Sequence, residues 1–260
     1  MLTYLVQVYD SRLFWLSLAV HDIRRRYRRS LLGMTWAMIQ PVLLALILCL
    51  VFGQAFQVGT WQYFLYVMTG LCFWNFVRHS VSGGCQSIRS AEMYIQQHRV
   101  PLAIYPLRFT LVGGFHFAVA ILPLTAVCWL TGGPPAAGAV ISLVGAIILL
   151  LIFGWSMASI FGVTNVFLPD TQHFTQVFLN LLFYATPIIW LPEMVRQRSF
   201  AWIVDYNPLA AFAELIRAPL LDGGSPSSAA LGLAAGLTAV AAVLAVLILA
   251  WCERRIIMRL

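Results

Sequence analysis

Long stretches without charged residues are the feature that most constrains how this chain can fold. Within the 260 residues, no Asp, Glu, Lys or Arg occurs in 30–77, 109–169, 171–192 or 223–252. One helical crossing of a bilayer needs about 20 apolar residues, so each stretch can cross once and the first two can cross twice. Because 61% of the residues are hydrophobic and 10% are charged, lipid is the main solvent of the chain. The sequence therefore predicts an all-α, polytopic membrane protein.

Polar turns divide the two longest stretches and give six expected spans. Residues 54–62 divide the first stretch, and the Gly- and Pro-rich segment 131–135 divides the second. The fifth span contains Pro187 and Pro192, which interrupt a regular helix, so this span is expected to be kinked or broken. The whole of 1–260 is predicted to be one transmembrane domain, with spans at 34–56, 61–83, 107–131, 137–164, 174–192 and 229–252.

All 16 basic residues are Arg, and their distribution predicts the orientation in the membrane. With six spans, the two ends of the chain and the segment between the second and third spans share one side, and these segments contain six, three and four Arg. The opposite side contains Arg196, Arg198 and Arg217. Cytoplasmic segments carry an excess of basic residues, so both termini are expected in the cytoplasm. The net charge of +7 then reflects topology, and nucleic acid is discarded as a partner.

The first 30 residues, 1–30, are expected to form an amphipathic helix at the membrane surface. Between 5 and 27, apolar side chains recur at intervals of three or four residues, while the charged side chains lie largely on other faces. Such a helix lies in the interface and turns its basic residues toward anionic headgroups. The alternative is a soluble helix with no special role. The residues expected to bind lipid headgroups are Arg24, Arg25, Arg26, Arg28 and Arg29.

The segment 193–221 is too long for a simple turn and too polar for a full span. It mixes charged side chains with aromatic ones, and Asn207-Pro208 interrupts it. The residue before a proline avoids the helical conformation. We therefore expect two short re-entrant helices in the outer leaflet, between the fifth and sixth spans.

The spans offer little catalytic chemistry. His116 is their main ionisable residue, and a lone His without a nearby Asp, Glu or Cys is more often a hydrogen-bonded helix residue than a ligand or base. Because the chain has no Lys, it can contain neither a GxxxxGK[ST] phosphate-binding loop nor a Schiff-base lysine. The five cysteines have no CxxC spacing. We expect no catalytic residue, no metal site and no cofactor in this chain.

Aromatic side chains follow one side of the second span. Tyr63, Tyr66, Phe73 and Trp74 fall within about 100° of one another at 3.6 residues per turn. Aromatic faces can stack on sugar rings weakly enough to let a chain slide, which makes these four residues candidates for a substrate path. The alternative is that they belong to an interfacial aromatic belt and to core packing.

Several segments, in their order along the chain, resemble one family. The run Asp22–Gly33, followed by Trp36 and Pro41, is similar to the start of the first span in type-2 ABC exporter permeases that move polysaccharides. The resemblance extends from about residue 20 to residue 222. Its later segments are Tyr66–Trp74, Arg99–Leu102, Thr186–Ile188 and Tyr206–Leu209.

The resemblance implies a homodimer of six-span subunits in the bacterial inner membrane, with two copies of a separate ABC ATPase subunit that binds ATP and Mg. The implied substrate is a lipid-linked polysaccharide, and O antigen is favoured because the run Arg26–Gly33 is most similar to that branch. Capsule and teichoic-acid polymers remain alternatives. An alternative of a different class is a membrane-embedded transferase that acts on a lipid-linked sugar.

By the same resemblance, residues 86–100 would form the cytoplasmic coupling helix that docks on the ATPase. A second contact is implied in the loop after the fourth span, which reads Leu168-Pro169-Asp170 and lacks the basic residue that relatives usually have before the Asp. The implied ATPase-docking residues are Arg89, Glu92, Gln96, His98, Arg99 and Asp170.

Overall fold

All regular secondary structure in the described part of the chain is helical, as the sequence predicts. Four of its helices are long and apolar enough to cross a membrane, which makes the protein a multi-pass membrane protein. The computed structural model describes residues 2–28, 33–53, 59–97, 100–133, 135–196 and 202–257.

The four long helices match four of the expected spans. They are α3 (Trp36–Phe52), α6 (Ile104–Gly132), α7 (Ala137–Phe167) and α12 (Ser228–Ile257). Their apolar side chains point in all directions, as in helices that meet both lipid and protein. Their ends differ from the expected ones by a few residues, because side-chain hydrophobicity does not mark where a helix leaves the membrane.

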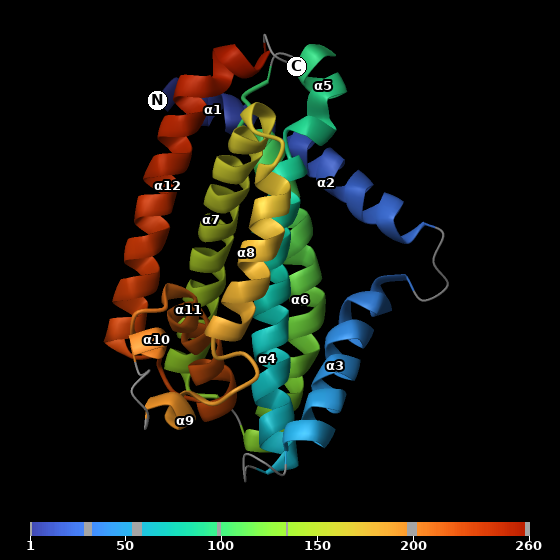
Figure 1. Ribbon diagram of the computed structural model, residues 1–260. Coiled ribbons are helices and arrows are strands. Elements are labelled where there is room, and N and C mark those ends of the chain that lie inside the picture. Colours follow the sequence, from blue (N-terminus) through green and yellow to red (C-terminus); the bar gives the residue numbers. More distant parts are fainter. Residues whose placement is uncertain are drawn as a thin grey trace.

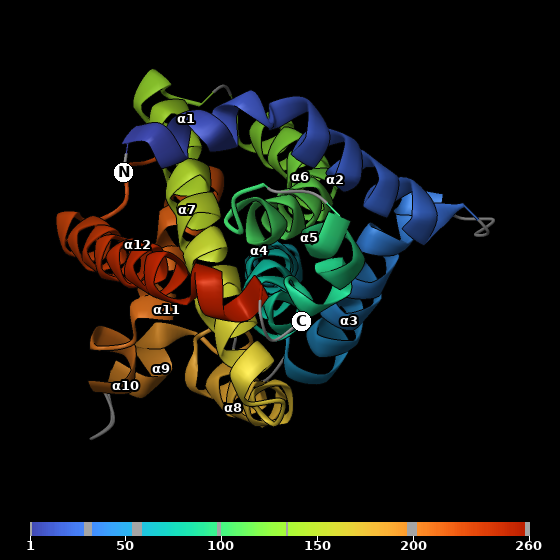
Figure 2. The ribbon, with the colours of Figure 1, turned by 90° about the horizontal axis from the view of Figure 1, so that it is seen from above.

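Two further helices occupy the second and fifth expected spans, α4 (Thr60–Arg78) and α8 (Thr171–Ala185). Figure 2 shows α4 near the centre of the molecule, and 12 of its 19 residues are buried, so it tolerates polar side chains that a lipid-facing helix would not. Helix α8 has 15 residues, or about 22 Å, which is shorter than the hydrocarbon core of about 30 Å. It ends at Ala185, before Pro187, so the helix is broken where expected, and the membrane span 174–192 stays a prediction.

The segments between the spans are more broken than expected. The expected interfacial helix is two helices, α1 (Leu2–Asp10) and α2 (Arg12–Tyr27), which meet in a turn at Ser11. The segment of the expected coupling helix, 86–100, is not one continuous helix. A π turn and two 3₁₀ turns lead into a short helix there: η2 (His79–Gly83), η3 (Gly84–Gln86), η4 (Arg89–Ala91) and α5 (Glu92–Gln97).

In the described part of the chain, three short helices lie between α8 and α12, where two were expected. The break at Asn207-Pro208 is confirmed, because the Asn207 side chain accepts a hydrogen bond from the Leu209 N–H at 2.9 Å and caps the next helix. These elements are α9 (Pro192–Arg196), α10 (Trp202–Asp205), α11 (Pro208–Arg217) and the π turn η5 (Ala218–Asp222).

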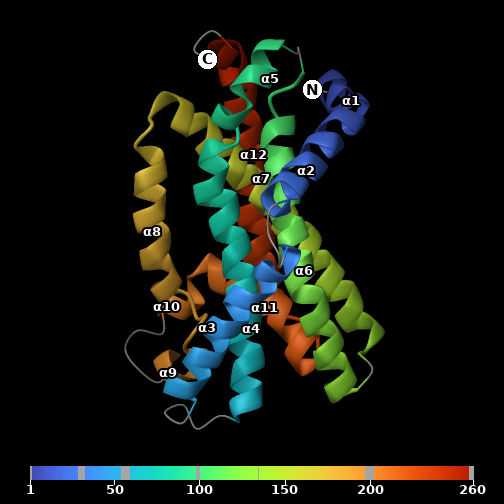
Figure 3. The same cartoon turned by 90° about the vertical axis from the view of Figure 1, so that its right-hand side faces the viewer.

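The charged connecting segments gather at two opposite ends of the helix bundle. Helices α1 and α5 and the last turns of α12 lie at one end, which we call the terminal end (Figures 1 and 3). Helices α9, α10 and α11 lie at the opposite end. The main hydrophobic core surrounds α4, and a second buried cluster at the terminal end joins α5 to the adjoining ends of α6, α7 and α12.

Glycine permits a close approach between η3 and α7. A Cβ added at Gly84 would lie 2.7 Å from the Ala158 Cα, and one added at Gly162 would lie 3.0 Å from the Gly84 carbonyl oxygen. Backbone atoms cannot move aside as the tip of a side chain can, so the two segments would have to separate.

Gly84→Ala is therefore expected to destabilise the subunit by about 1–3 kcal/mol through overpacking. The measurement is thermal unfolding of the purified protein in detergent. Gly145→Ala is the matched control, because a Cβ there meets no heavy atom within 4 Å and alanine favours the helix. Equal unfolding temperatures for the two variants would contradict the close-packing argument.

Candidate functional site

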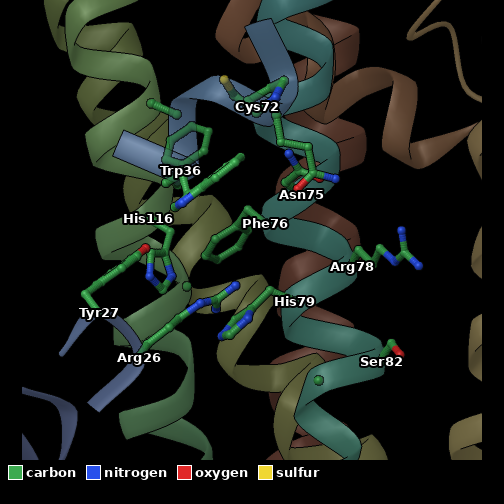
Figure 4. Close-up of a pocket in the computed structure, with 17 residues that line it drawn as sticks. Arg26, Tyr27, Trp36, Cys72, Asn75, Phe76, Arg78, His79, Ser82 and His116 are labelled. Carbon is green, nitrogen blue, oxygen red and sulfur yellow. The ribbon is translucent and has the colours of Figure 1, made fainter. Parts of the chain in front are cut away.

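A cavity of 390 Å³ lies among α2, α3, α4 and α6 (Figure 4). We call it the basic cavity, because its lining includes two Arg and two His side chains and no carboxylate. The side chains that can form hydrogen bonds in its lining are Arg26, Tyr27, Trp36, Gln40, Asn75, Arg78, His79, Ser82 and His116.

His79 is held in place at one wall of the basic cavity. Its ring stacks on Phe109 with centroids 4.4 Å apart, and its Nε2 donates a hydrogen bond to the Phe109 carbonyl oxygen at 3.1 Å. A Cβ at Gly113 would overlap the ring, so glycine is needed beside it. Because a carbonyl can only accept, Nε2 carries the proton, and Nδ1 of the neutral ring remains as a hydrogen-bond acceptor.

Arg26 reaches into the cavity from α2. Figure 4 shows its guanidinium between His79 and His116, and the Tyr27 ring meets the His116 ring edge-on with centroids 5.6 Å apart. The His116 Nε2 atom is buried and has no hydrogen-bond partner within the described part of the chain. Burial raises the pKa of the Tyr27 hydroxyl, with a smaller opposing effect of Arg26, so Tyr27 stays a neutral donor at neutral pH.

The basic cavity was only partly foreseen from the sequence. Of the five arginines expected to bind headgroups, Arg24, Arg25, Arg26 and Arg28 are exposed, Arg26 also lines the cavity, and Arg29 lies outside the described residues. His116 was judged an ordinary helix residue. The available signal was the pair of polar amides in apolar spans, Gln40 and Asn75, both of which line the cavity.

Three of the four aromatic residues proposed as a substrate path are buried within the subunit. Tyr63 and Phe73 are fully buried and Trp74 is 5% exposed, whereas Tyr66 borders a cavity of 960 Å³ beside α11. The Tyr63 hydroxyl donates to the Ile189 carbonyl at 2.8 Å, so this tyrosine anchors the segment after α8. The structure does not test whether the four residues form a path, and that role stays a prediction.

Arg217 of α11 clamps the segment after α8 against α4. Its Nη1 donates to the Pro187 carbonyl at 2.6 Å, and its Nη2 donates to the Tyr66 and Ile188 carbonyls at 3.2 and 3.4 Å. Its Cζ also lies 3.6 Å from the centroid of the Tyr66 ring, close enough for a cation–π interaction. A Cβ at Gly70 would overlap this guanidinium, so glycine leaves room for it. Sequence reasoning missed this clamp.

The expected ATPase-docking residues lie at the terminal end, where the structure describes them. Arg89, Glu92 and Gln96 are exposed on η4 and α5, and Asp170 is exposed in the turn between α7 and α8. His98 and Arg99 lie outside the described residues. The other side of α5 is fixed, because Ile95 is buried in the second hydrophobic cluster. The segment can therefore present a polar face while it stays attached to the spans.

Arg108 joins three elements beneath this face. Its side chain is 5% exposed, and its Nε forms an ion pair with the Asp22 carboxylate of α2 at 3.2 Å. Its Nη2 donates to the Ser90 hydroxyl of η4 at 3.4 Å. Arg108 itself belongs to α6, so it links the surface helix, the docking segment and a span. From the sequence this residue counted only toward topology.

Comparison with known proteins gives one family. The sequence profile described as ABC-2 type transporter matches residues 14–221. Two proteins of Klebsiella pneumoniae, both named O-antigen export system permease protein RfbA, are 29% identical over 73% of each chain and 28% identical over 78% of each chain. The polysialic acid transport protein KpsM of Escherichia coli is 24% identical over 80% of this chain and 81% of its own.

Proposed function

Because this chain belongs to the ABC-2 type transporter family, we propose that it is the membrane-spanning permease subunit of an ATP-driven exporter of lipid-linked polysaccharide. The observation that carries the proposal is the family match, which extends from α2 to η5. O antigen is the favoured polymer, because the two Klebsiella relatives bear that name. The KpsM relative keeps a capsule polymer as the alternative.

We further propose that two copies of this chain form a homodimer that ATPase subunits move, and the geometry at the terminal end supports this. We propose that two separate ATPase subunits dock on Arg89, Glu92 and Gln96, with Asp170 as a second contact. Arg108 then passes movement of this segment to α6 and α2. Rigid elements that are joined by packed side chains and hydrogen bonds can move as one body.

The proposed topology has six spans, with α4 and α8 added to the four long helices, both termini in the cytoplasm and α9 to α11 in the outer leaflet of the inner membrane. A reporter fused after Leu260 is expected to read cytoplasmic, and one inserted at Gly133 is expected to read external. The reason is the excess of Arg at the terminal end. A cytoplasmic reading at Gly133 would rule out this topology.

The proposed function is tested by reconstituting this chain with its partner ATPase in lipid vesicles. ATP hydrolysis is expected to depend on this chain, and the chain is expected to restore polymer export to cells that lack it. Replacing Arg89 and Glu92 together with Ala should reduce the chain-dependent hydrolysis without loss of membrane insertion, because both side chains are exposed and support no packing. An ATPase that neither binds this chain nor responds to it would refute the proposal.

A further inference from the structure

Two amide side chains occupy unusual positions for a membrane protein. Gln40 lies in α3 and Asn75 in α4, both within charge-free apolar segments, and both side chains are exposed in the subunit. An amide that faces hydrocarbon without a hydrogen-bond partner costs free energy, so such groups turn toward a polar space. Both line the basic cavity. The basic cavity therefore has a polar lining at a depth where the neighbouring side chains are apolar.

The lining of the basic cavity changes character along its length. Figure 4 shows Arg26, His79 and His116 together at one end, and Trp36, Cys72 and the amide of Asn75 toward the other, so that end carries one amide among apolar side chains. Phe117 and Ala120 add apolar side chains to the lining. Arg78 borders the cavity but points away from it, so it takes no part in the argument. A ligand that matches this gradient has a polar head and an apolar chain.

The polar end is suited to an anion. Arg26 supplies a guanidinium that can donate two parallel hydrogen bonds to phosphate oxygens. The buried Nε2 of His116 has no partner among the described residues, and the Tyr27 hydroxyl is a further donor. Among the described residues no carboxylate lines the cavity, so the lining that the structure describes leaves the positive charge of Arg26 uncompensated. The volume of 390 Å³ lies at the lower end of ligand pockets, about 300–1,000 Å³.

We propose that the basic cavity binds the phosphate-bearing head of one lipid molecule. The head lies against Arg26, His116 and the Tyr27 hydroxyl, and the first part of the lipid chain lies along Trp36 and Phe117. This chemistry fits two sources, the diphosphate of a polyprenyl carrier and the phosphate of a membrane phospholipid. Assignment to the carrier rests on the proposed function, whereas the phosphate site itself rests on the cavity.

The proposal is tested by binding to the full chain in nanodiscs of phosphatidylcholine, without any ATPase. Farnesyl diphosphate is the probe, with farnesol as its phosphate-free counterpart, and binding of both is followed by displacement of a fluorescent prenyl diphosphate. Farnesol is expected to bind at least about tenfold more weakly, because it cannot accept the charge-assisted hydrogen bonds. Arg26→Gln should lower the affinity for farnesyl diphosphate by at least about tenfold for the same reason.

The matched control is Arg12→Gln, which removes the same charge from the same helix. The Arg12 guanidinium lies over the Tyr9 ring, away from the cavity, so this variant should bind like the wild type. A second variant, Ala37→Phe, fills the cavity from α3 without touching a charge and should weaken farnesyl diphosphate binding. Equal affinity of wild type and Arg26→Gln, or of farnesol and farnesyl diphosphate, would overturn the proposal.

Phosphatidylglycerol added to the nanodiscs distinguishes the two sources. Displacement of the probe at equal concentration assigns the site to membrane phospholipid, and failure to displace it assigns the site to the carrier. Either result supports a phosphate site. Because no ATPase is present, loss of binding in this assay is distinguishable from failure of the proposed export function, which shows in chain-dependent ATP hydrolysis.

Discussion

Replacing Arg217 with Met is expected to loosen the end of the molecule formed by α9, α10 and α11. The substitution removes the guanidinium donors from the carbonyls of Pro187, Ile188 and Tyr66. The Pro187 carbonyl keeps the Tyr66 hydroxyl as a donor and the Tyr66 carbonyl keeps the Thr69 hydroxyl, so the main cost falls on the Ile188 carbonyl. An unsatisfied buried carbonyl costs about 1–3 kcal/mol, and the cation–π contact with Tyr66 is lost as well, while release from burying the guanidinium offsets part of the cost. We expect a net loss of about 1–3 kcal/mol, measured by thermal unfolding, and new proteolytic cleavage between residues 186 and 207.

Two further variants separate the parts of this clamp. Arg217→Lys keeps the charge but loses the planar fork, so it should give an intermediate loss of stability. Tyr66→Phe removes the hydroxyl bonds to the Pro187 and Trp190 carbonyls but keeps the ring under the guanidinium, so its effect should be smaller. An unfolding temperature unchanged by Arg217→Met would contradict the clamp.

The helices that cross the membrane could be predicted because lipid imposes a simple rule on sequence. Uninterrupted apolar stretches give α6, α7 and α12 nearly in full, since a helix satisfies the backbone groups of a single segment in hydrocarbon without a partner segment. Proline marks the end of α8 and the start of α11, where the missing N–H and the fixed backbone angle act locally. These features depend on residues that are close together along the chain.

The turns at the terminal end could not be predicted because contacts between distant segments decide them. The chain from 79 to 91 turns through η2, η3 and η4 because Gly84 packs on the α7 backbone at Ala158, far along the sequence. Hydrophobicity alone favoured one regular helix there.

The functional residues were harder to foresee, since their partners come from remote parts of the chain. Arg217 reaches Thr69, 148 positions away, and Arg108 reaches Asp22 on another helix. From sequence, an arginine beside a span counts toward orientation, and nothing local shows that it is buried. Arg26 is exposed like its neighbours Arg24 and Arg25 and differs from them in that it lines the basic cavity.

Arg108→Met is expected to uncouple ATP hydrolysis from export. The variant breaks the link that joins η4 and α2 to α6, so movement of the docking segment no longer reaches the span as one body. In the reconstituted exporter, polymer moved per ATP hydrolysed should fall at least about tenfold if a coupling interaction of about 1.4 kcal/mol or more is lost. Hydrolysis itself should persist, because the exposed docking face is unchanged.

The structural and coupling roles of Arg108 can be separated with a second substitution. Arg108→Met alone leaves the Asp22 carboxylate without its ion-pair partner. Breaking a fully buried ion pair costs about 3–5 kcal/mol, and the cost here should be smaller because Asp22 is one-third exposed. Adding Asp22→Leu removes that charge and should recover most of the stability, since an apolar pair often replaces an ion pair without loss. Export per ATP should stay low in the double variant, because the hydrogen bond to Ser90 is still missing. Recovery of export together with stability would show that Arg108 serves the fold alone.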